Sequence, residues 1–122
     1  MAVWKHEKDQ TVWASLGHQN MKYILGLLDI MSLLFFGLEI TITSAIREKN
    51  PEKKSFHPLG QAIDLRTKTI PVRMIWVWEM TIKMVNGIWH VMRKPGRFDY
   101  VRECVGEENE HMHIEYDTGD PV

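Results

Sequence analysis

The chain has 122 residues, of which 44% are hydrophobic and 25% are charged. These values are typical of a soluble globular protein, and the length suits one small domain, 1–122. The formal net charge of −1 argues against nucleic acid as the main partner, because phosphate binding needs a basic surface. The single cysteine, Cys104, rules out an internal disulfide, and its strand-like neighbours predict a buried, reduced thiol.

The first element expected along the chain is a buried helix. The most hydrophobic stretch, residues 23–38, is interrupted by Asp29 and is shorter than the about 20 apolar residues that span a bilayer. It predicts a helix that begins near Asn20 and ends at Gly37, and no stable membrane span. We expect residues 1–20 to be peripheral. Residues 1–13 contain no apolar run of the kind that a signal peptide needs, so we expect the protein to be cytoplasmic on synthesis.

A strand is expected over residues 39–47, because the side chains alternate between two faces. One face carries Ile40, Ile42, Ser44 and Ile46, and the other carries Thr41, Thr43, Ala45 and Arg47. Residues 49–58 are rich in lysine, glutamate and proline and predict a loop at the rim of the domain.

A polar cluster follows, from Ser55 to Asp64. His57 and Asp64 offer an imidazole and a carboxylate, which are both zinc ligands. In a helix the two side chains would lie about 10 Å apart along the axis, and on a regular strand they would point to opposite faces. A loop that turns at residues 58–60 and enters a strand at Ala62 brings both to one ion. In that strand the site face carries Ala62, Asp64 and Arg66, and the core face carries Ile63 and Leu65.

The remaining elements are a helix and two strands. Apolar residues at spacings of three and four predict a helix over residues 72–92, which Pro95 and Gly96 follow. Residues 98–105 predict a strand, and residues 111–116 predict a second, with His111 and His113 on its polar face. Helices packed on one face of a mainly antiparallel sheet make an α+β domain, with the site on the other face.

The two polar clusters together resemble a known family. The pattern Ser-x-His-x-x-Gly-x-Ala-x-Asp is met by Ser55, His57, Gly60, Ala62 and Asp64, and a Glu-x-x-His follows at Glu110 and His113. This arrangement resembles the zinc D-alanyl-D-alanine carboxypeptidases and L-alanyl-D-glutamate endopeptidases of bacteria and phages. These enzymes share the Hedgehog-type zinc-peptidase fold. The resemblance covers about residues 39–117 and makes them the motif-bearing core of the domain.

The resemblance implies a site with one Zn²⁺. His57, Asp64 and His113 match the zinc ligands, and Arg47 matches an arginine that binds substrate or stabilises the oxyanion. Ser55 and Arg66 are further candidates for substrate binding. The alternatives are that Arg47 is a surface charge and that Ser55 only hydrogen-bonds its own loop.

Two residues are candidates for proton transfer. Glu110 matches the carboxylate that acts as general base on the metal-bound water. Glu110 and His113 have opposite parity on a regular strand. Either Glu110 therefore sits at the irregular entry of the strand, or His111 does part of the proton handling.

Three functions compete. The leading one is a zinc metallopeptidase that hydrolyses peptidoglycan stem peptides at D-Ala-D-Ala or L-Ala-D-Glu bonds. A phage-encoded member would act on the cell wall after release or from a virion. The second is a non-catalytic zinc-binding structural or interaction module of a phage or bacterial assembly. The third is a peptidase-like fold whose site holds no metal.

Overall fold

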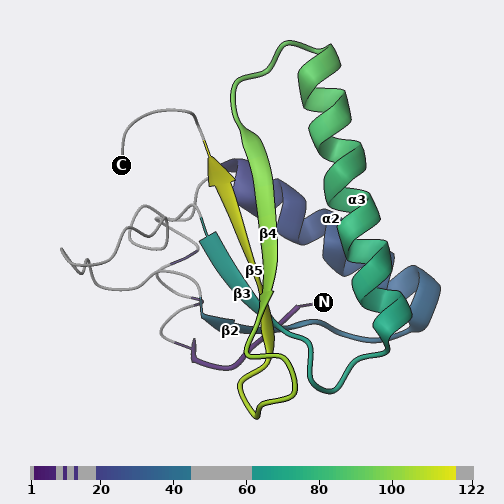
Figure 1. Cartoon of the computed structure of the whole chain (residues 1–122), viewed down its shortest axis with the longest axis vertical. Coiled ribbons are helices and arrows are strands. Elements are labelled where there is room, and N and C mark those ends of the chain that lie inside the picture. The colour runs from purple at the N-terminus through teal and green to yellow at the C-terminus, as the bar shows by residue number, and fades with distance from the viewer. Residues whose placement is uncertain (1, 8–9, 11–12, 14–18, 45–61, 118–122) are drawn as a thin grey trace, which may run out of the picture.

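The computed structural model describes residues 2–7, 10, 13, 19–44 and 62–117. In these parts, two helices cover one face of a five-stranded sheet, as Figure 1 shows. This is the predicted α+β architecture, with helices on one face and a mostly antiparallel sheet. The prediction of a single domain over residues 1–122 stays a prediction.

The sheet is built from strands that lie far apart along the described chain. Its strands are β1 (Val3–Trp4), β2 (Thr41–Ser44), β3 (Ala62–Arg66), β4 (Arg97–Glu103) and β5 (His111–Asp117). They lie in the order β1-β2-β3-β5-β4, and every neighbouring pair is antiparallel apart from β1 and β2. The motif-bearing strands β3 and β5 are therefore adjacent at the middle of the sheet.

The expectation that residues 1–20 are peripheral is wrong in two places. Val3 and Trp4 form β1, which pairs in parallel with β2 and is anchored by the Val3 N–H donating to the Ile40 carbonyl at 2.7 Å. Trp13 is only 5% exposed and belongs to the hydrophobic core. Two residues are too short a run to show strand periodicity, which is why the pattern did not reveal this pairing.

The two helices match their predicted extents closely. Helix α2 covers Gln19–Phe36, and Gly37 follows with a φ of 64°, a left-handed conformation that glycine adopts readily and that ends a helix. Helix α3 covers Val72–Val91. None of the helices in the described parts is long and apolar enough to cross a bilayer.

A buried hydrogen-bond relay joins the helices to each other. The Trp78 Nε1–H donates to the Ser32 hydroxyl at 2.8 Å, and that hydroxyl donates to the Leu28 carbonyl at 2.8 Å. Both side chains are fully buried, so the pairing satisfies polar groups that would otherwise be costly to bury. It fixes the register of α3 against α2.

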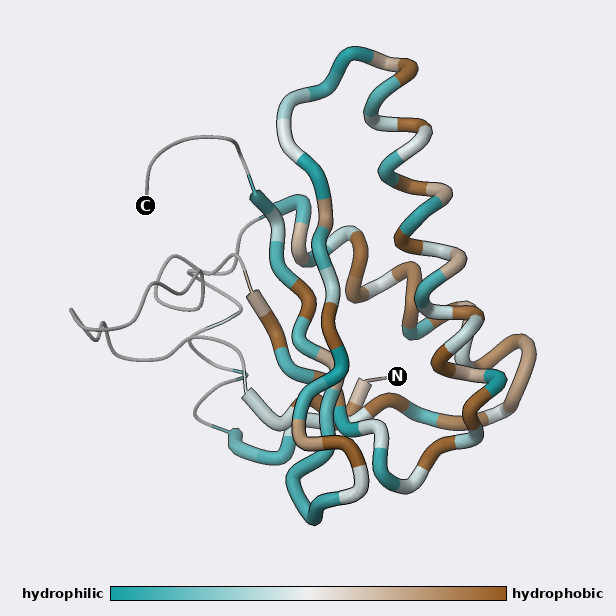
Figure 2. The backbone as a smooth tube through the Cα atoms, in the orientation of Figure 1, coloured by the Kyte–Doolittle hydropathy of each residue, from teal (hydrophilic) through white to brown (hydrophobic). Residues whose placement is uncertain are grey.

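The hydrophobic core lies between the helices and one face of the sheet. Apolar residues recur along both helices and alternate with polar ones along the strands (Figure 2). The sheet contributes Ile63, Leu65, Met112, Ile114 and Tyr116, which are at most 2% exposed. Because strand side chains alternate in direction, the residues between them point to the opposite, helix-free face.

The turn between β4 and β5 differs from the prediction. The strand expected to reach residue 105 ends at Glu103, and Cys104 follows with a positive φ of 56°. Cys104 is only partly buried, so the expectation of a buried thiol in a strand is wrong. Gly106, with a φ of 85°, completes the reversal and brings the chain to Glu110 at the entry of β5.

Candidate functional site

Asp64 and His113 meet on the helix-free face of the sheet. They are direct cross-strand partners of β3 and β5, and the His113 Nδ1 lies 2.8 Å from the Asp64 Oδ1. Asp64 is 2% exposed. The sequence predicts that β3 and β5 each supply a zinc ligand to one site. The structure places these two candidate ligands side by side, with their side chains in contact.

A second carboxylate holds the other nitrogen of the His113 ring. The His113 Nε2 lies 3.1 Å from the Glu115 Oε1, two residues further along the same face of β5. Burial opposes the charged form of His113, but the hydrogen bond and the charge of Asp64 outweigh it. Together with Glu115 and Glu103, they raise the pKa of the imidazole above its usual value.

This pair fits two corners of a zinc site. Two donors that each lie about 2.1 Å from a tetrahedral ion are about 3.4 Å apart, so the Asp64–His113 contact would have to open by only a fraction of an ångström. Glu115 would keep the ring oriented, since a metal-bound histidine usually donates its second N–H to a carboxylate. The third predicted ligand, His57, lies outside the described residues. Within those residues no group of three or more His, Cys, Asp or Glu side chains is arranged to hold a metal.

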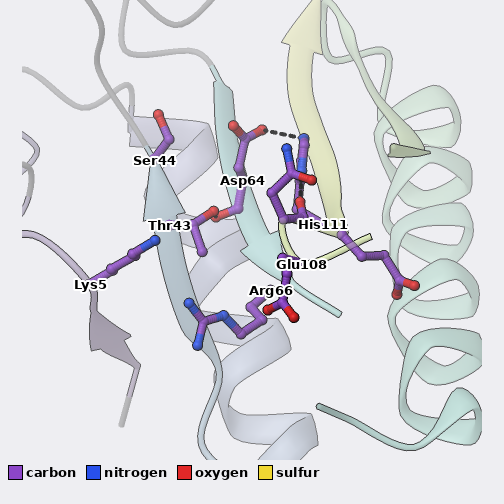
Figure 3. A pocket seen from close by; sticks show the side chains of 9 residues that line it. Lys5, Thr43, Ser44, Asp64, Arg66, Glu108 and His111 are labelled. Atoms are coloured by element: carbon purple, nitrogen blue, oxygen red, sulfur yellow. Dashed lines mark hydrogen bonds and ion pairs between the residues drawn. The ribbon is translucent and has the colours of Figure 1, made fainter. Parts of the chain in front are cut away.

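A cavity of about 390 Å³ opens beside Asp64. It is lined by Lys5, Thr43, Ser44, Asp64, Arg66, Glu108, Asn109, Glu110 and His111. Figure 3 shows where the labelled side chains come from: Lys5 from the N-terminal segment, Thr43 and Ser44 from β2, Asp64 and Arg66 from β3, and His111 from the entry of β5. The lining carries both cations and carboxylates, which suits a substrate that is itself charged and polar.

An irregularity in β2 brings Ser44 to this cavity. Ile42 pairs with Leu65 and Ser44 pairs with Asp64, so β2 advances by two residues where β3 advances by one. Such a bulge re-aims the side chains that follow it. Ser44, which strict alternation predicts on the core face, therefore lines the cavity together with Thr43. The Thr43 hydroxyl also donates to the Asp64 carbonyl at 3.3 Å.

His111 lies between two charged cross-strand partners, Arg66 on β3 and Glu103 on β4. Its Nδ1 lies 2.7 Å from the Asn109 carbonyl. Because a carbonyl can only accept, Nδ1 carries a proton and the neutral ring has its lone pair on Nε2. That Nε2 lies 3.9 Å from the Asp64 Oδ1, and Figure 3 shows the two side chains facing each other. His111 can thus accept a proton beside the candidate ligands.

Glu110 precedes β5, so it sits at the irregular entry of the strand, as one of the two sequence alternatives required. Its carboxylate is buried and fully engaged. The Thr67 hydroxyl donates to Oε2 at 2.5 Å, Arg102 donates to Oε2 at 3.1 Å, and the Gly106 N–H donates to Oε1 at 3.0 Å. These contacts, Thr67 and then Gly106 foremost, lower the pKa of Glu110 to about 2.

The structure brings together most, but not all, of the residues predicted for the site. Asp64, Arg66, Glu110 and His111 line one cavity, and His113 contacts Asp64. The predictions for Arg47, Ser55 and His57 fall on residues that the structure does not describe.

Among the contributors to the site that sequence analysis missed are Lys5, Ser44 and Glu115. Lys5 reaches it through the short strand β1, and Ser44 through the bulge in β2; neither feature has a pattern that periodicity can detect. Glu115 had a signal, because it shares the polar face of β5 with His113 at a spacing of two.

Comparison of the chain with protein-family models, with curated proteins and with solved structures finds no match in any of the three.

Proposed function

We propose that the protein is a zinc-dependent peptidase that hydrolyses peptidoglycan stem peptides. The observation that carries this proposal is the 2.8 Å contact between Asp64 and His113 on the helix-free face of the sheet. Their motifs are separated by a whole helix and a strand, α3 and β4, yet both side chains end at one place. His57 is the proposed third ligand.

The cavity beside the pair supports the substrate class. Stem peptides carry free carboxylates, and Arg66 and Lys5 place two cations on the cavity wall. Arginine can pair with a carboxylate through two parallel hydrogen bonds, whereas lysine acts as a point charge. We assign Arg66, together with Arg47 and Ser55, to substrate binding.

Hydrolysis of the peptide bond requires a group that takes a proton from the attacking water and returns it to the leaving amine. A zinc ion at this site would make the water acidic and polarise the scissile carbonyl. Two side chains of the cavity wall can move the proton: His111 through its Nε2, and Glu110, which the family resemblance assigns. Glu110 would first have to leave Thr67 and Arg102.

The proposal is tested by incubating zinc-loaded protein with defined stem peptides and measuring the product masses by mass spectrometry. Release of D-alanine identifies a carboxypeptidase, and cleavage after L-alanine identifies an endopeptidase. Loss of the general base typically costs about 10²- to 10⁴-fold in rate. Comparing Glu110→Gln with His111→Ala, at equal zinc content, identifies the base as the residue whose replacement causes the larger loss.

One observation favours a second candidate, a non-catalytic zinc-binding module of a phage or bacterial assembly. The Glu110 carboxylate is held by three donors, and its low pKa makes it a weak base. Stoichiometric zinc binding without cleavage of any stem peptide would establish this candidate and exclude the peptidase. Cleavage by the wild type that is lost in Asp64→Asn would exclude the module.

A further inference from the structure

The outer flank of α3 is apolar along its whole length. Seven large side chains form this α3 stripe, and their exposed fractions range from 48% to 80%: Val72, Trp76, Met80, Met84, Ile88, Val91 and Met92. The C-terminal half of α3 forms the right-hand edge of the molecule in Figure 1, with no other element outside it. Large apolar side chains exposed together along one flank of a helix are typical of an interaction site.

A hollow interrupts the stripe near its C-terminal end. It has a volume of about 490 Å³ and is lined by Met84, Gly87, Ile88, Val91 and Met92. A Cβ atom added at Gly87 would meet no atom within 4 Å, so nothing within the chain requires a glycine there. Glycine in a helix interior costs about 1 kcal/mol relative to alanine. The missing side chain leaves space beside the helix at this position.

We propose that the α3 stripe binds the same stripe of a second copy of this chain, with the two helices antiparallel. Six of the seven residues of the stripe are placed symmetrically about position 82, and Val91 has no counterpart among them. Three pairs of its residues lie at equal distances from that position: Met80 with Met84, Trp76 with Ile88, and Val72 with Met92. In a two-fold interface, residue i of one copy contacts residue j of the other and j contacts i, so this symmetry makes the stripe complementary to itself.

The same two-fold axis places the largest side chain of the stripe, Trp76, opposite the hollow of the other copy. Trp76 is 59% exposed and stands six residues, or about 9 Å along the axis, on one side of position 82. Gly87 and Ile88 stand five and six residues on the other side. In the antiparallel pair, the Trp76 indole of each copy therefore enters the hollow beside Gly87 of the other.

Charges beside the stripe favour the antiparallel arrangement. Glu79 and Lys83 are one helical turn apart and flank the same side of the stripe. When two helices pack antiparallel about a two-fold, the same flank of each faces the other. With the two-fold at position 82, Glu79 of one copy and Lys83 of the other are offset by two residues, or about 3 Å along the axis, so each Glu79 lies near Lys83 of the other copy. The two-fold thus creates two pairs of opposite charge between the copies, each between Glu79 and Lys83.

The proposal is independent of the metal site and is tested on the full chain by sedimentation velocity over a range of concentrations. The expected result is a monomer that converts to a dimer in the micromolar range. Each single reversal, Glu79→Lys or Lys83→Glu, turns two attractive pairs into repulsive ones and should weaken the dimer about tenfold. The double reversal Glu79→Lys with Lys83→Glu should restore it, because the pairs are then only exchanged.

A glycine pair supplies the matched control. Gly26 in α2 is, like Gly87, an exposed helical glycine with no atom within 4 Å of an added Cβ. Gly87→Leu fills the hollow and should abolish the dimer, while Gly26→Leu should leave it unchanged. Both variants should keep the helical circular dichroism of the wild type, because leucine is a better helix former than glycine.

Three outcomes would overturn the proposal. They are a wild type that stays monomeric at all concentrations, a double reversal that is weaker than either single one, and equal effects of Gly87→Leu and Gly26→Leu. Flotation with phosphatidylglycerol vesicles tests whether the α3 stripe binds a membrane surface instead of a second copy. A monomer that binds these vesicles through Met84, and loses binding in Met84→Glu, would assign the stripe to a membrane surface instead.

Discussion

The two faces of the sheet are built on different physical principles. On the helix-covered face, Ile63, Leu65 and Ile114 are fully buried, and their contribution depends on the apolar area removed from water. On the other face, Asp64 and His113 depend on one pairing register and on specific hydrogen-bond partners. The first face tolerates exchange between side chains of similar volume. The second does not, because a buried carboxylate that loses its partner costs free energy.

Because of this difference, we expect substitutions on the two faces to have different effects: those on one face change stability, and those on the other change the proposed metal binding. Substitutions under the helices should lower the free energy of unfolding and leave the chemistry of the remaining folded molecules intact. Substitutions on the polar face should alter metal binding with a smaller effect on folding.

The largest expected effect comes from the helix-covered side. Trp78→Ala removes a fully buried indole and leaves the Ser32 hydroxyl without its donor, so it should lower the free energy of unfolding by about 3–5 kcal/mol. Urea denaturation at low protein concentration measures this. Trp76→Ala is the matched control, since Trp76 is 59% exposed and should change stability by less than about 0.5 kcal/mol. Equal losses in both variants would show that the buried relay contributes nothing.

The next largest loss of stability is expected at Glu110, which lies at the entry of β5. Glu110→Gln weakens three hydrogen bonds to a carboxylate and should cost about 1.5–3 kcal/mol near neutral pH. Because the folded pKa of Glu110 is lowered to about 2, its contribution is present above the unfolded pKa, near 4.5, and is lost as the pH falls towards 2.

The difference in unfolding free energy between wild type and Glu110→Gln should therefore be full above about pH 5 and shrink towards pH 2. Urea denaturation at several pH values measures it. Glu108→Gln is the control, because it makes the same change at a side chain that is 97% exposed. A difference that stays constant with pH would contradict the low pKa.

A smaller effect is expected on the polar face. Glu115→Gln removes the carboxylate that orients His113 and should weaken zinc binding by about 10- to 100-fold, with the fold unchanged. Isothermal titration with zinc measures the dissociation constant. Asp99→Asn is the control, because Asp99 is the cross-strand partner of Glu115 but pairs with Arg97 at 2.6 Å. Equal dissociation constants for wild type and Glu115→Gln would remove Glu115 from the site.

The helices and strands of the core were predictable from the sequence because the spacing of apolar residues shows which face of an element is buried. The spacing of Trp78, Ile82 and Trp89 marks one face of a helix, and the alternation around His113 marks a strand. The bounds of α2 and α3 follow from this signal and from Gly37. The adjacency of β3 and β5 was implied only by the shared ligand chemistry of Asp64 and His113.

What the sequence did not reveal depends on tertiary pairing. The bulge that turns Ser44 to the cavity exists only in relation to β3, and Lys5 arrives through a parallel pair formed by two residues. The left-handed conformation at Cys104 ends β4 in a turn, although the residues up to 105 have a strand-like pattern. The contacts of Glu110 with Thr67 and Arg102 join three segments that no local motif connects.

The central claim is that the Asp64–His113 pair is part of a zinc site. Its most direct test is the thermal and urea stability of metal-free protein as zinc is added, compared with Asp64→Asn and His113→Ala. A ligand that binds only the folded state stabilises it by about 1.4 kcal/mol for each tenfold rise in concentration above its dissociation constant. We expect this gain in the wild type, with about one zinc bound per chain, and its loss in both variants. A wild type that gains no stability from zinc, or variants that gain as much as the wild type, would contradict the claim.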